Sequence, residues 1–127
     1  MLRFSAIWAL LTGVTLAVLE VRANWGDWQW WPFWLVDFVA AALLLLGGVR
    51  TLRAPHLGKP WLTAGWAFTF GMAWMSLGGN IAAGPDPDRD FRLAGFYIVL
   101  VGALVGSSLL GLVCALFGKT GPNQSNE

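Results

Sequence analysis

The sequence predicts an all-α protein, a four-helix transmembrane bundle, on three grounds. First, 57% of the 127 residues are hydrophobic and 12% are charged, with a mean hydropathy of +0.61, whereas soluble domains carry about 25% charged residues. Second, the apolar residues fall into four blocks, and a membrane-spanning helix needs about 20 such residues. Third, no block shows the period-two alternation of a transmembrane strand.

The four expected spans cover residues 4–21, 32–49, 61–83 and 91–117. Each is expected to be helical, because a helix pairs its backbone N–H and C=O groups internally and an open strand in lipid does not. The first block also has features of a signal peptide, with Arg3 before it and a small-residue site at Val21-Arg22-Ala23. Its apolar run exceeds the roughly 7–15 residues of a signal-peptide core, which favours a retained helix.

The segments between the blocks contain residues that end or start helices. A tryptophan-rich stretch precedes Pro32, which suits the first turn of a helix because its missing N–H costs little there. Residues 50–60 are expected to form a basic loop with two prolines, and residues 84–88 a turn of Gly, Pro and Asp. Residues 1–118 are therefore expected to form one membrane domain, and residues 119–127 a disordered tail.

The placement of Lys and Arg predicts that both termini are cytoplasmic. With four spans, one side of the membrane receives five basic residues: Arg3, Arg50, Arg53, Lys59 and Lys119. The other side receives three: Arg22, Arg89 and Arg92. Because the cytoplasmic side of a membrane protein is the more basic one, we expect the termini inside, in a bacterial cytoplasmic (inner) membrane. Because the two sides differ by only two basic residues, insertion of the chain in both orientations (dual insertion) is the alternative.

The composition excludes several classes of function. The single cysteine, Cys114, rules out an internal disulfide, and the single histidine, His56, rules out a bis-histidine haem site within one chain. No cluster of zinc ligands is visible, so we expect no metal and no cofactor. A net charge of +1 without a basic stripe indicates no nucleic-acid partner.

Tryptophans crowd the predicted outer end of the second span. The group comprises Trp25, Trp28, Trp30, Trp31 and Trp34. Indole rings favour the headgroup level of a membrane, so an aromatic belt is one interpretation. The other is an aromatic platform that binds a flat ligand, a lipid or a partner subunit.

A polar cluster is the second candidate site. Asp37 lies within the second span, and ionisable residues in a span mark substrate or proton sites by default. It lies five residues past Pro32, about 7–8 Å along the helix, which places it in the outer half of the membrane. Four further residues are expected at a similar level: Glu20, Arg22, Asn80 and Arg92. The alternative role is structural, with Asp37 hydrogen-bonded towards Asn80 or towards Trp or Arg groups of the outer rim.

Small residues recur at helical spacing on the first and fourth spans. They include Ala9, Gly13 and Ala17 on the first, and Ser107 and Gly111 on the fourth, beside a Gly102–Gly106 pair. Such stripes allow helix backbones to approach closely in lipid. They predict packing within the bundle or, alternatively, an interface between copies of the chain.

Together these features favour a small, non-enzymatic membrane protein. It would be an accessory or scaffold component that binds lipid or a partner membrane protein through its outer Trp-rich face. The alternative is a small oligomeric transporter or channel with Asp37 as the coupling or substrate site. An enzyme is less favoured, because a lone Asp37 has no evident acid–base partner.

Overall fold

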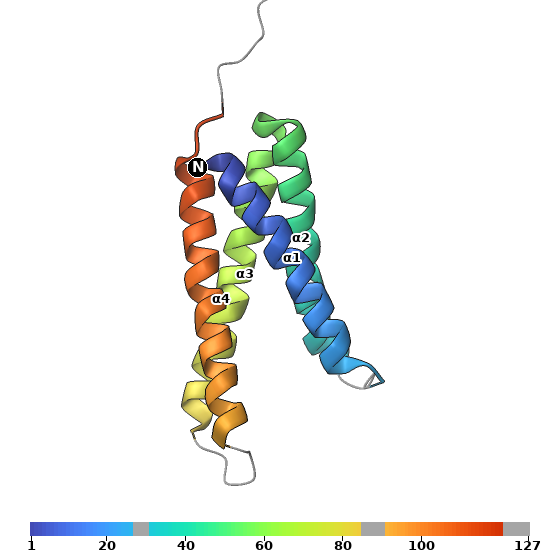
Figure 1. The fold of residues 1–127 in the computed structure, drawn as a ribbon, viewed down its shortest axis with the longest axis vertical. Coiled ribbons are helices and arrows are strands. Elements are labelled where there is room, and N and C mark those ends of the chain that lie inside the picture. The colour runs from blue at the N-terminus through green and yellow to red at the C-terminus, as the bar shows by residue number, and fades with distance from the viewer. Residues whose placement is uncertain (27–30, 85–90, 121–127) are drawn as a thin grey trace, which may run out of the picture.

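The computed structural model is built from four α-helices and describes residues 1–26, 31–84 and 91–120 (Figure 1). The helices are α1 (Leu2–Asn24), α2 (Trp31–Arg53), α3 (Pro55–Ala83) and α4 (Phe91–Phe117). The described residues contain no strand, so the all-α prediction is confirmed. The expected disordered tail lies largely outside the described residues.

Three helices are long and apolar enough to cross a membrane: Leu2–Arg22, Trp34–Arg53 and Gly95–Phe117. They correspond to the first, second and fourth expected spans. Helix α3, expected as the third, is not among the candidate spans found in the described part of the chain. Its 29 residues include tryptophans and several glycines, which hydropathy scales rank well below Leu, Ile and Val.

The connection between α2 and α3 is much shorter than expected. The sequence favours a loop over residues 50–60, but α2 continues to Arg53 and α3 begins at Pro55, which leaves Ala54 alone between them. Pro55 occupies the first turn of α3, where a proline is well tolerated. Pro60 lies in the second turn, where its missing N–H deprives only the carbonyl of His56 of a helical partner.

Glycines bring the backbones of α2 and α3 into direct contact. A Cβ atom on Gly47 would lie 2.6 Å from the Cα of Leu62, and a Cβ atom on Gly58 would overlap the backbone of Thr51. At Gly65 a Cβ atom would meet the backbone carbon of Leu43 at 3.0 Å. Only glycine fits at Gly47 and Gly58, and these positions therefore fix the α2–α3 hairpin.

The core lies at the end of the bundle that holds both described ends of the chain. It comprises Leu2, Ala6, Ala9, Leu44, Leu62, Trp66 and Ala115. A hydrogen-bonded chain crosses it: the indole Nε1 of Trp66 donates to Ser5 Oγ at 2.9 Å, and Ser5 Oγ donates to the carbonyl of Gly111 at 2.8 Å. These bonds join α1, α3 and α4. Nearby, Lys59 Nζ donates to the carbonyl of Gly118 at 2.9 Å.

The helices part towards the other end. Figure 1 shows α1 and α2 diverging as one pair from α3 and α4 as another. We call residues 1–13, 41–66 and 107–118 the closed end, and residues 14–26, 31–40, 67–84 and 95–106 the open end. Closed-end glycines lie against neighbouring helices or chain segments, whereas a Cβ atom on any described open-end glycine of α3 or α4 would meet nothing within 4 Å. Packing is therefore concentrated at the closed end.

Candidate functional site at the open end

The open end brings two acidic side chains together. Glu20, near the end of α1, and Asp37, in the second turn of α2, lie close enough for their side chains to interact. Both residues are half-buried. Two neighbouring carboxyl groups repel each other when both are ionised, and one proton shared between them removes that repulsion. Chemically, the pair is able to hold one proton between α1 and α2.

The other predicted members of the polar cluster are more dispersed. Asn80 is half-buried on α3, and its Nδ2 donates to the carbonyl of Ser76 on the same helix at 2.7 Å. Arg22 is exposed at the end of α1, and the side chain of Arg92 lies outside the described part. Asp37 thus interacts with Glu20 on α1, whereas the sequence suggested Asn80 on α3 or Trp or Arg groups of the outer rim. The physical reason is that the α1–α2 pair separates from α3 at this height (Figure 1).

The tryptophan group is described only in part. The side chain of Trp25 is 80% exposed just after α1. Trp34 is half-buried in the first turns of α2 and packs edge-on against Phe38, with ring centroids 5.6 Å apart. Trp28 and Trp30 lie outside the described residues, as does the side chain of Trp31. The two described rings belong to the open end.

The small-residue stripe of α1 packs inside the bundle along most of its length. Ala9 is fully buried in the core. A Cβ atom on Gly13 would lie 3.0 Å from Cγ of Leu45 and 3.1 Å from the carbonyl oxygen of Ala41. Ala17, one turn further on, is half-buried. The small-residue stripe of α1 is therefore most deeply buried at the closed end.

On α4, Ser107 and Gly111 of the predicted stripe pack inside the bundle. At the closed end, a Cβ atom on Gly111 would overlap the indole ring of Trp66, and Ser107 Oγ accepts a hydrogen bond of 2.7 Å from Nε1 of Trp8. Gly102 and Gly106 form a separate pair on another face of α4. Gly102 precedes Gly111 by nine residues, about two and a half turns, so the two glycines face opposite sides of the helix. A Cβ atom on Gly102 or Gly106 would have no neighbour within 4 Å, so this face of α4 meets no other part of the described chain.

Sequence reasoning missed the two features that hold the closed end together. One is Trp66, which is fully buried and joins Ser5 to the face of Gly111. The other is the glycine contact between α2 and α3. A signal for the latter exists, because Gly58 and Gly65 are seven residues apart and share one face of a helix.

Within the described residues, no three His, Cys, Asp or Glu side chains lie close enough to hold a metal ion. Comparison of the chain with known proteins adds no further assignment. No protein-family model, no curated protein and no solved structure matches it. The functional argument therefore depends on the geometry of the chain itself.

Proposed function

We propose that this chain is an accessory or scaffold component of the membrane, which binds a helix of a partner membrane protein at its open end. The partner is either another protein or a second copy of the chain. The observation that carries the proposal is the uncovered Gly102–Gly106 face of α4: a Cβ atom on either glycine would meet no atom within 4 Å. The same holds for three open-end glycines of α3, namely Gly71, Gly78 and Gly79. Three helices with the length and apolarity of spans support placement in a membrane.

Physical chemistry favours a helix as the occupant of the open end. Helices associate in lipid by close van der Waals packing at small residues, and a Gly-xxx-Gly pair is a typical contact point. Gly102 and Gly106 form such a pair, and the chain itself leaves it uncovered. The exposed ring of Trp25 borders the same end at the expected headgroup level. A partner helix would gain close backbone contact there, and lipid chains would not.

The proposal includes an orientation. Helix α3 would cross the membrane as a fourth span, because it extends alongside the other three helices (Figure 1). The closed end would then face the cytoplasm of a bacterium, with five Lys and Arg residues on that side against three on the other. The open end would lie in the outer half of the inner membrane.

Site-specific photo-crosslinking in cells tests the proposal. A photoreactive residue at position 106 is expected to form an adduct with one defined membrane protein or with a second copy. The matched control is position 116, which is also on α4 and is 50% exposed at the closed end. Gly106→Leu, combined with a photoreactive residue at position 102, should abolish the adduct while the variant still folds. Equal adducts at 106 and 116, or none at 106, would contradict the proposal.

The Glu20–Asp37 pair favours a second candidate, an oligomeric transporter or channel that couples to protons. Asp37→Asn preserves the side-chain shape and can donate to the Glu20 carboxylate, but it removes the exchangeable proton. In a transporter this variant would fold and lose proton uptake into vesicles. In the accessory protein it would leave complex formation unchanged, whereas Asp37→Leu would strand Glu20 and loosen the α1–α2 pair.

A further inference from the structure

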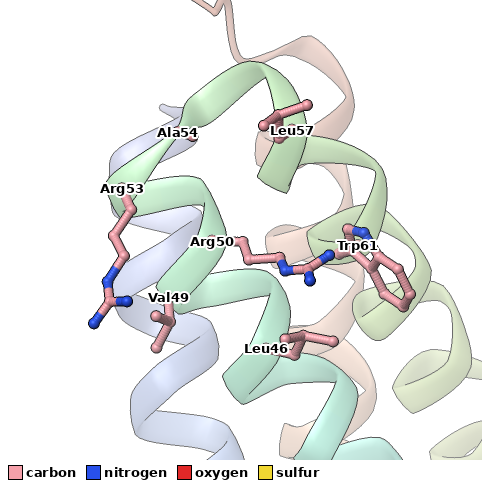
Figure 2. A pocket seen from close by; sticks show the side chains of 7 residues that line it. All are labelled: Leu46, Val49, Arg50, Arg53, Ala54, Leu57 and Trp61. Carbon is pink, nitrogen blue, oxygen red and sulfur yellow. The ribbon is translucent and has the colours of Figure 1, made fainter.

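A second surface, at the closed end, has the properties of a binding site. A groove of about 500 Å³ runs along the outer side of the α2–α3 hairpin. Its lining is mostly apolar and includes Leu46, Val49, Arg50, Arg53, Leu57 and Trp61. Figure 2 shows Arg50 reaching across towards Trp61, whereas the side chain of Arg53 points to the other side of α2. The groove lies at the opposite end of the bundle from the surface proposed above for a partner helix.

One of the two arginines is held in place by an aromatic ring. In Figure 2 the side chain of Arg50 extends from α2 across to Trp61 of α3. Its Cζ atom lies 5.1 Å from the centroid of the Trp61 ring. A guanidinium group stacked on a ring face keeps its in-plane N–H groups available for an anion, and such stacking reduces the freedom that the side chain would lose on binding.

The charge at this end of the molecule is uncompensated among the described residues. Their acidic side chains are those of Glu20 and Asp37, and both belong to the open end. The charged side chains of the closed end and its flanking residues are all cationic, namely those of Arg3, Arg50, Arg53, Lys59 and Lys119. The last turn of α2 gains from its two arginines through the helix dipole. The helix dipole accounts for positive charge at this position. It does not account for the apolar groove or for the contact between Arg50 and Trp61.

On the inner side of Arg50, away from the α2–α3 connection, the groove is apolar. Leu46 lies one turn before Arg50 on α2, about 6 Å nearer the middle of the helix. A ligand that fits therefore carries an anionic group at the membrane surface and an apolar chain pointing inward. We propose that the groove binds one anionic phospholipid, with its phosphate at Arg50 and an acyl chain along Leu46 and Trp61. Basic pockets between helices bind anionic headgroups in this manner.

Native mass spectrometry of the purified full chain tests this site. The protein is reconstituted with equal amounts of phosphatidylglycerol and phosphatidylcholine, and the lipids that stay bound are counted. The wild type should retain one phosphatidylglycerol in preference to phosphatidylcholine. Arg50→Gln should lower that preference about fivefold, the effect of one cationic contact near a membrane surface. Lys119→Gln removes the same charge at the same end but outside this groove, and its effect should be clearly smaller.

Three outcomes would overturn the proposal. Equal losses in Arg50→Gln and Lys119→Gln would mean that the whole basic end attracts lipid without a site. Equal retention of both lipids by the wild type would exclude an anionic ligand. Displacement of phosphatidylglycerol by millimolar inorganic phosphate would assign Arg50 to a soluble anion. If circular dichroism shows that Arg50→Gln does not fold, the experiment uses Arg50→Lys and Trp61→Leu instead. Both should weaken lipid retention, because each removes one member of the Arg50–Trp61 pair.

Discussion

At Ser5, one hydroxyl group connects three helices. It accepts a hydrogen bond from the indole of Trp66 on α3 and donates one to the carbonyl of Gly111 on α4. Ser5 and Trp66 are both fully buried. A buried indole N–H without a partner is costly, so this position needs a small side chain that also carries an acceptor. Serine meets both requirements.

Ser5→Ala should therefore destabilise the closed end by about 1–3 kcal/mol, because the indole N–H of Trp66 loses its acceptor. Cys114 provides the measurement, since its thiol is free and buried and becomes reactive on unfolding. Its labelling by a thiol-specific dye is followed against temperature. Ser107→Ala is the matched control: it also removes an acceptor from a tryptophan, Trp8, but at an exposed bond. Equal shifts of the two midpoints would contradict the role assigned to Ser5.

Helix α4 carries small residues on two faces. Ser107 and Gly111 contact other helices, whereas the Gly102–Gly106 pair faces another direction and contacts none. At Gly111 the backbone lies directly against the ring of Trp66, whereas a Cβ atom on Gly106 would have no atom within 4 Å. One face of α4 thus belongs to the core of the bundle, and the Gly102–Gly106 face is available surface.

This difference predicts opposite results for the same substitution at two places on α4. Gly111→Leu should lower stability by about 1–3 kcal/mol, because the added side chain overlaps the ring of Trp66. Gly106→Leu should leave the thermal midpoint of the isolated protein unchanged, because its side chain meets no protein atom. Thermal unfolding in detergent, followed by circular dichroism, compares the two. A stable Gly111→Leu variant would show that the α3–α4 contact is not as close as described.

At the scale of the whole molecule, the number of membrane crossings decides the orientation. Three helices qualify as spans by length and apolarity. If α3 also crosses, both ends of the chain share one side of the membrane, and the basic closed end lies on it. If α3 stays on one face, the two ends lie on opposite sides.

Cysteine labelling on each side of α3 distinguishes these arrangements. Leu57 is 62% exposed at the start of α3, and Asp88 follows its end in the segment outside the described residues. In a Cys114→Ala background, Leu57→Cys and Asp88→Cys should react with a membrane-impermeant reagent from opposite sides. Thr51, next to this region, is unsuitable for labelling because it is fully buried. Reaction of both cysteines from the same single side would exclude a fourth span.

The class of protein and the presence of four helices follow from local properties of the sequence. Apolar runs near the length of a span, with few charges and no strand periodicity, are enough to predict membrane helices. Each helix pairs its own backbone N–H and C=O groups and needs no other part of the chain to do so. The helix ends are less well predicted. Residues 50–60 contain two prolines and suggested a loop, but both prolines are accommodated in the first turns of α3.

Contacts between helices were decided by the tertiary structure. The sequence singled out Asp37 but not its interaction with Glu20, and it identified the small residues of α4 but not which of them pack inside the bundle. It contained no sign that Arg50 stacks on Trp61. These contacts depend on how far each helix is rotated and shifted against its neighbours. Rotation and shift are fixed by the close approach of α2 and α3 at Gly47 and Gly58 and by the fit of Trp66, and helical periodicity does not encode them.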